Sequence, residues 1–140
     1  MMSFLIERMK IMIQQFVELG QGYGDIYELC EIIKTNETRF HQAFIFTCTI
    51  DGKKRASIAV ALKPVGDSKF MPIYICREGI PYGEEKRSKR MELFEETVQS
   101  IGRKAVIVET KPSTDFTETF LFYQYLIGIL RMNHYIPPMH

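Results

Sequence analysis

The residue pattern with the clearest chemical potential is Glu109-Thr110-Lys111, which follows a short apolar stretch. An acid-x-lysine pattern is typical of hydrolytic sites where carboxylates and a lysine converge on a divalent metal and a water molecule. Such a site needs the pattern on the third strand of a meander and an aspartate on the neighbouring strand. Here the third strand ends in Cys76-Arg77-Glu78 instead. We therefore expect Glu109 and Lys111, the first catalytic candidates, to be solvated residues at a strand end.

Cys76 is the other catalytic candidate, as a thiolate activated beside Arg77 at the end of a strand. A nucleophilic cysteine needs a general base. The sequence gives no reason to place His41, His134 or His140 close to Cys76. Because its neighbours Ile73 and Ile75 are apolar, we expect a buried cysteine in the core.

Cations that end predicted strands suggest a site for a small anionic ligand. Lys63 and Lys111 each precede a proline at the end of an apolar stretch, and Arg77 ends a third stretch. Cations gathered at one edge of a sheet would form a pocket for an anion. The strands ending in Lys63 and Arg77 are expected to be antiparallel. Only one of those two residues can therefore lie beside Lys111.

The composition argues against several classes of function. The 18 lysines and arginines balance 17 acidic residues, so no net field recruits nucleic acid or an acidic membrane. The cations between Lys86 and Arg90 share their predicted helix with glutamates on either side, which is typical of a solvated helix face. Histidines and cysteines show no metal-ligand spacing, and the glycine-rich loop 20–24 lacks the full phosphate-binding pattern. We expect no metal and no cofactor.

The cysteines and the amino-terminal residues indicate a cytoplasmic protein. Three cysteines in apolar patterns fit free thiols in a reducing compartment. No apolar stretch reaches the roughly 18 residues of a membrane span. Glu7, Arg8 and Lys10 interrupt the first apolar residues, unlike a signal peptide. We expect residues 1–11 to be an optional extension and residues 12–140 to form one domain.

The candidate residues belong to a predicted α+β domain with a single mixed sheet of about five strands and three helices, in the order β-α-β-β-β-α-β-α. Strands are predicted over residues 13–19, 43–50, 55–63, 71–77 and 105–109, and helices over 25–34, 84–101 and 115–133. Asp51-Gly52 predicts a type I′ hairpin between two strands. Apolar or small residues on both faces of the central strands indicate that both faces are covered. The inner order α-β-β-β-α-β is similar to the core order of restriction-endonuclease-like nuclease domains.

The last predicted helix favours a homodimer. Its apolar residues, from Phe116 to Leu130, cover most of its circumference. A helix that is apolar nearly all round must be buried on nearly all sides. In a chain of 140 residues, a second copy is the easiest source of the outer wall.

Several stretches of the sequence together resemble a known family. They are residues 16–20 with Gly22-Tyr23, then 25–29, 73–81, 123–131 and 133–138. They are similar to a small family of uncharacterised proteins from Gram-positive bacteria, over nearly everything after Met12. The resemblance implies no established activity. Some members carry the label methylthioribose kinase, but this chain lacks a catalytic Asp/Asn loop, an Asp-Phe-Gly motif and the length of two kinase lobes.

The sequence therefore favours a non-catalytic cytoplasmic homodimer that acts by interaction or by binding a small ligand. The alternative is a small enzyme that acts on a nucleotide or sugar phosphate, or a degenerate nuclease-like domain. That alternative predicts a cleft containing Glu109 and Lys111, and stabilisation by metal.

Overall fold

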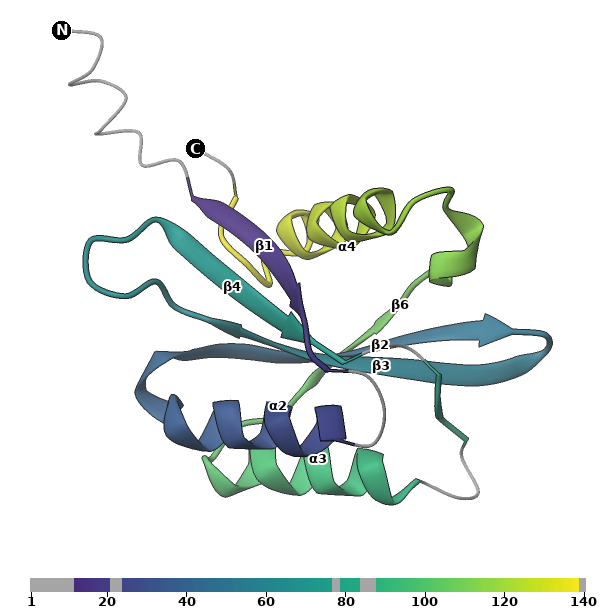
Figure 1. The fold of residues 1–140 in the computed structure, drawn as a ribbon, viewed down its shortest axis with the longest axis horizontal. Helices are drawn as coiled ribbons and strands as arrows, with labels where there is room; N and C mark the ends of the chain where they lie inside the picture. Colours follow the sequence, from purple (N-terminus) through teal and green to yellow (C-terminus); the bar gives the residue numbers. More distant parts are fainter. Residues whose placement is uncertain (1–11, 21–23, 77–78, 84–87, 139–140) are drawn as a thin grey trace, which may run out of the picture.

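A computed structural model describes residues 12–20, 24–76, 79–83 and 88–138 (Figure 1). The predictions for residues 1–11 and for Arg77 lie outside these ranges. The strands are β1 (Ile13–Glu18), β2 (Phe40–Ile50), β3 (Lys53–Leu62), β4 (Phe70–Ile75), β5 (Ile80–Pro81) and β6 (Val106–Glu109). The α-helices are α2 (Gly24–Thr35), α3 (Lys89–Ser100) and α4 (Thr119–Met132). Short 3₁₀ turns occupy Glu37–Arg39 and Ser113–Asp115.

The β2–β3 hairpin is the longest paired segment of the sheet. Its ladder runs from Ile50 opposite Lys53 to Phe40 opposite Leu62. At the tip, Asp51 and Gly52 have φ values of 51° and 76°. Positive φ at both central positions is the requirement of a type I′ turn. The hairpin predicted at Asp51-Gly52 is confirmed.

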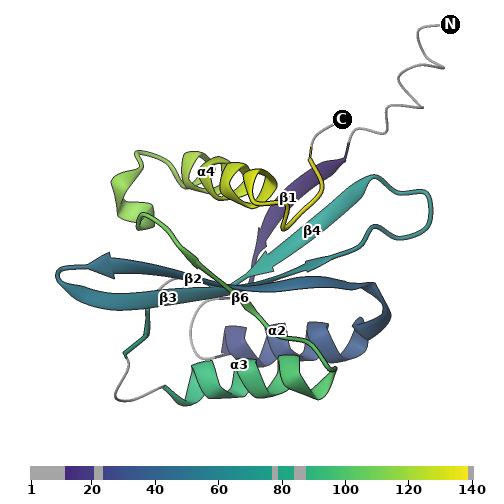
Figure 2. The same ribbon diagram turned by 180° about the vertical axis from the view of Figure 1, so that it is seen from behind.

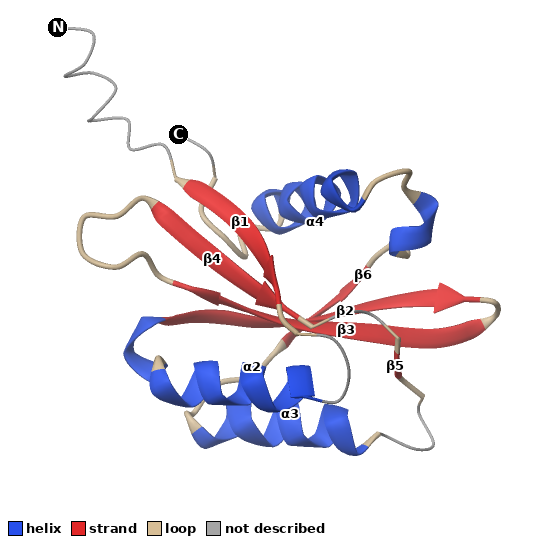
Figure 3. Cartoon of the chain, in the orientation of Figure 1, coloured by secondary structure: helices blue, strands red, loops and turns tan. Residues whose placement is uncertain are grey.

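All six strands form a single mixed sheet in the order β1-β4-β3-β2-β6, with β5 paired to β3 (Figure 3). β1 is parallel to β4 and β6 is parallel to β2, whereas β3 is antiparallel to β2, β4 and β5. The α+β class and the predicted order are confirmed, with one difference. The extra strand, β5, is only two residues long, too short to leave a periodic signal in the sequence.

Helices cover both faces of the sheet, as the apolar central strands predicted. α2 and α3 lie side by side on one face and α4 lies on the other (Figures 1 and 2). Alternate residues of β3 divide between two cores: Ile58 and Val60 pack with the helix pair, and Ala59 and Ala61 pack with α4. We call these the helix-pair face and the α4 face.

The start of α4 differs from the prediction. The Asp115–Glu118 pair suggested a capping box, but α4 begins at Thr119, and Glu118 precedes it without a side-chain capping bond. Phe116 has extended backbone angles. Its ring packs against Phe122 and Tyr125, with ring centroids 5.6 and 5.1 Å apart. This aromatic packing in an extended segment accounts for the later start of the helix.

Candidate functional site

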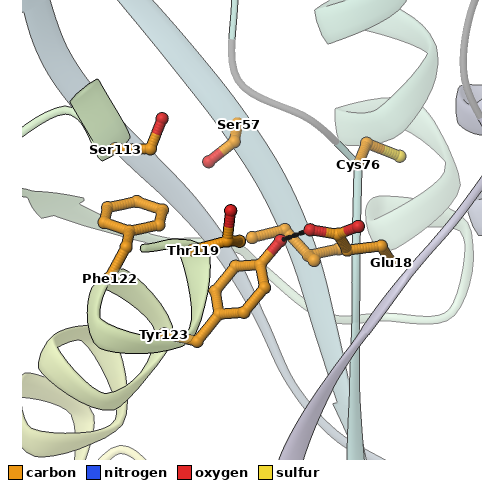
Figure 4. Close-up of a pocket in the computed structure, with 8 residues that line it drawn as sticks. Glu18, Ser57, Cys76, Ser113, Thr119, Phe122 and Tyr123 are labelled. Atoms are coloured by element: carbon orange, nitrogen blue, oxygen red, sulfur yellow. Dashed lines mark hydrogen bonds between the residues drawn. The ribbon is translucent and has the colours of Figure 1, made fainter. Parts of the chain in front are cut away.

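A cleft of about 320 Å³ opens where the carboxyl ends of β1 and β4 meet the first turn of α4 (Figure 4). It is formed by β1, β3, the end of β4, the 3₁₀ turn at Ser113–Asp115, and α4. The lining residues are Glu18, Ser57, Ile75, Cys76, Ser113, Thr119, Phe122 and Tyr123.

Strand register brings the sheet side of the cleft together. Glu18 lies opposite Ile75 in the parallel β1–β4 pair, so two strand ends reach the same level. Ser57 shares a face of β3 with Ala59 and Ala61, because side chains alternate along a strand. The row of small side chains leaves room beneath the first turn of α4. The cleft therefore results from the small side chains along this face of β3.

Tyr123 closes one side of the cleft. Its ring stacks on Phe16, with centroids 4.8 Å apart and planes at 21°. Its hydroxyl donates a hydrogen bond to the carboxylate of Glu18, drawn as the dashed line in Figure 4. Phe16 and Glu18 are two residues apart and so lie on the same side of β1. One strand therefore holds both the ring and the hydroxyl of Tyr123.

Cys76 lines the cleft, but its thiol is turned toward α2. In Figure 4 the sulfur points away from the hydroxyls of Ser57 and Thr119. The thiol donates to the backbone carbonyl of Asp25 at 3.3 Å. Burial raises the pKa of the Cys76 thiol strongly, and the nearby charge of Asp25 raises it further. The environment of Cys76 therefore opposes the thiolate that nucleophilic catalysis requires.

The buried acid beside Cys76 belongs to the helix-pair face. Asp25 sits in the first turn of α2 and is only 2% exposed. Its Oδ1 atom has no hydrogen-bond partner among the described residues. Because Asp25 lies across β4 from Tyr123 and Thr119, it does not belong to the wall of the cleft.

The other predicted site residues lie outside the cleft. Glu109 is exposed on β6 opposite Thr47. Lys111 is also exposed, and its backbone N–H donates to the Tyr125 hydroxyl at 3.1 Å. Lys63 follows the far end of β3, beyond Leu62. The antiparallel hairpin thus separates Lys63 from Lys111, and the described lining of the cleft includes neither lysine nor Glu109.

A second cavity, of about 440 Å³, adjoins the cleft. It runs between β1 and α4 and shares Thr119 and Tyr123 with the cleft. Its other lining residues are Ile13, Gln14, Gln15, Phe16, Phe120, Gln124 and Ile127. We call this cavity the β1–α4 groove.

Sequence reasoning missed the polar residues of the cleft. Ser57 looked like one of the small residues that allow a helix to approach, and Tyr123 counted among the apolar residues of its helix. The available signal was the two-residue spacing of Phe16 and Glu18, which places both side chains on the same side of the strand that Glu18 ends. No sequence pattern connects β1 to α4, which lie about 100 residues apart along the chain.

Comparison with known proteins identifies the family. A family model described as "Domain of unknown function (DUF7147)" matches residues 12–136. Neither the comparison with curated proteins nor that with solved structures found a match. Among the described residues, no helix is both long enough and apolar enough to cross a membrane.

Proposed function

The chain belongs to the DUF7147 family, and we propose from the geometry of its cleft that it binds a small, uncharged, polyhydroxylated ligand without converting it. The observation that carries this proposal is the convergence of polar side chains from separate elements on one cavity. Ser57, Ser113 and Thr119 supply hydroxyls, and Glu18 with Tyr123 supplies a carboxylate and a phenol. Cavities of this size with a few convergent polar groups are the usual form of small-molecule sites.

The charge of the lining favours a neutral ligand over the anion suggested by the strand-end cations. Of the described residues that line the cleft, Glu18 alone carries a formal charge, and that charge is negative. An ionised carboxylate only accepts hydrogen bonds, and its two oxygens retain free sites after Tyr123 has donated. A pair of neighbouring ligand hydroxyls can donate to those sites. A phosphate group would be repelled by them.

The ligand's remaining groups also find partners in the cleft. Serine and threonine hydroxyls both donate and accept, so Ser57, Ser113 and Thr119 suit the mixed hydrogen bonding of a sugar or a nucleoside ribose. The apolar walls at Phe122 and Ile75 suit the C–H face of such a ring. Binding without conversion is favoured because the thiol of Cys76 is turned away and kept protonated.

Calorimetric titration with ribose, glucose and adenosine, beside inorganic phosphate, tests the proposal. We expect at least one hydroxylated compound to bind and to raise the melting temperature, since a ligand that binds only the folded state stabilises it. Glu18→Gln should weaken that binding about tenfold, because hydrogen bonds to a charged group contribute more than neutral ones. Lys63→Ala, at the far end of the hairpin, is the control and should bind normally. Phosphate binding by the wild type, with no binding of any hydroxylated compound, would contradict the proposal.

A second element of the proposed function is a homodimer through α4. Two large apolar side chains in the first turn of this helix, Phe120 and Leu121, are exposed in the single chain. Burial of such residues is the usual driving force of association. Light scattering at micromolar concentration should give about twice the chain mass of 16.4 kDa. A mass of 16.4 kDa at every concentration would exclude the dimer.

A further inference from the structure

The β1–α4 groove carries exposed apolar side chains at its rim. Phe120 is 63% exposed and Ile13 is 55% exposed, and both line the groove. Four consecutive residues of β1, 13–16, also line it. Consecutive residues of a strand point to opposite faces. A cavity lined by all four therefore reaches around the edge of the strand.

That edge has backbone groups available for pairing. Among the described residues, β1 pairs with β4 and with no other strand. The N–H groups of Ile13 and Leu19 donate to Lys69 and Ile75, at 2.8 and 3.0 Å. Since bonding alternates along a parallel pair, the backbone groups of Gln14 and Phe16 point away from β4. An edge of this kind is a template for a further strand.

We propose that a second copy of this chain occupies the groove, with the two β1 strands paired antiparallel about a two-fold axis. This inference rests on the homodimer proposed above and assigns its surface. A two-fold interface uses the same patch on both copies, so the patch must be complementary to itself. Two copies of one strand meet this requirement, because antiparallel pairing is symmetric about a two-fold axis.

The distribution of charge agrees with self-pairing. Natural sheet edges are usually protected by charged side chains, but none of the described residues that line the groove is charged. Glu18 is the single charged residue of β1 and lies at its end. With the axis at Gln15, Gln14 would pair with Phe16 of the partner subunit, and each Glu18 would face Met12 of the partner subunit. The two carboxylates would then lie at opposite ends of the interface and would not repel each other closely.

The groove and the cleft share two residues, so the proposed interface touches the ligand site. Thr119 and Tyr123 line both cavities. A second copy in the groove would press against the ring of Tyr123 on the side away from Ser57. The partner subunit would thereby form the outer support of the Tyr123–Glu18 pair.

Sedimentation analysis of charge variants separates this surface from the rest of α4. Phe120→Glu and Ile13→Lys each place a charge inside the proposed interface, and we expect each to weaken dimerisation about 100-fold. Met132→Glu is the matched control on the same helix, since Met132 is 81% exposed and lies outside the groove. Its dimer should persist. If Met132→Glu loses the dimer and Phe120→Glu keeps it, the groove is not the interface, although the homodimer remains. A monomeric wild type would contradict both the interface and the homodimer.

Disulfide cross-linking tests the strand pairing itself. Gln15→Cys places a thiol near the two-fold axis, and the native cysteines Cys30, Cys48 and Cys76 are buried and should remain unreacted. Mild oxidation should give a covalent dimer of Gln15→Cys but not of Lys63→Cys. Deletion of residues 2–11 should leave the dimer intact. A monomeric full chain whose deletion variant dimerises would mean that the chain's own first residues occupy the groove, and the proposal would be wrong.

Discussion

The two faces of the sheet are built from different kinds of side chain. The helix-pair face is mainly aliphatic, with Ile26, Leu29, Ile33, Ile58 and Val60 fully buried. The α4 face is rich in aromatic rings and holds the cleft and the β1–α4 groove. Its rings belong to Phe16, Phe44, Phe46, Phe122, Tyr123 and Tyr135. Aromatic pairs pack in a few offset or edge-to-face arrangements, and both cavities described above lie among these rings. The difference suggests that one face supplies stability and the other supplies binding surface.

The α4 face also holds hydrogen bonds to the carboxyl-terminal segment. On the α4 face, the Gln14 side chain accepts from Arg131 Nε at 2.6 Å and donates to the Pro137 carbonyl at 2.7 Å. His41 Nε2 lies 3.0 Å from the Tyr135 carbonyl. These contacts fasten the carboxyl-terminal segment across the sheet. The α4 face therefore combines ring packing with hydrogen bonds that hold the carboxyl-terminal segment.

The largest expected effect compares one phenylalanine from each face. Phe94→Ala on α3 should lower the free energy of unfolding by about 3–5 kcal/mol, because the side chain is fully buried and leaves a cavity. Phe122→Ala should cost about 1 kcal/mol less, since Phe122 already borders the cleft and water can fill the space. Urea denaturation of both variants measures the difference. Equal losses would mean that the two faces are packed alike.

A smaller effect is expected from the hydrogen bonds of the α4 face. Gln14→Ala removes partners from Arg131 and from the Pro137 carbonyl, and should cost about 1–3 kcal/mol. Gln15→Ala is the matched control on the neighbouring, exposed position and should change stability by less than about 0.5 kcal/mol. Chemical denaturation below the concentration of dimerisation compares the two. Indistinguishable variants would refute the structural role of Gln14.

The smallest effect tests whether water is excluded from Cys76 on the helix-pair face. Burial, and then Asp25, raises the pKa of Cys76 above its ordinary value of 9.0. Above pH 9 the unfolded chain loses the thiol proton and the folded chain keeps it. The contribution of the Cys76 thiol to the free energy of unfolding is therefore fully present below pH 9. Above pH 9 it falls by about 1.4 kcal/mol per pH unit. The stability advantage of wild type over Cys76→Ala should shrink at that rate between pH 9 and 10.5, and a constant difference would contradict the burial argument.

The fold was largely predictable because its signals are local. Apolar periodicity located β1, α2 and the β2–β3 hairpin to within a few residues, and the Asp51-Gly52 pair identified the turn. The errors lie where tertiary contacts override local preference. The start of α4 is one example, since the ring of Phe116 packs on Phe122 and keeps the preceding residues out of the helix.

The cleft was much less predictable, because its residues come together only through the sheet order. Among the candidates that the structure describes, Cys76 alone proved to line it. Glu18 and Tyr123 meet because β1 inserts beside β4 and because α4 crosses back over both, and neither event has a local signature. Glu109 and Lys111 stood out by spacing alone. Spacing along one strand does not indicate which other residues the fold will bring to it.

The contact between Gln14 and the Pro137 carbonyl has a consequence for the connectivity of the chain. It holds the first strand against the last described residues, so the two ends of the fold are neighbours. A short linker can therefore join residue 138 to residue 12, with new ends opened at the exposed Asp51-Gly52 tip. Such a circular permutant would keep every strand pairing of the sheet, and a reporter domain inserted at the tip would sit away from the cleft.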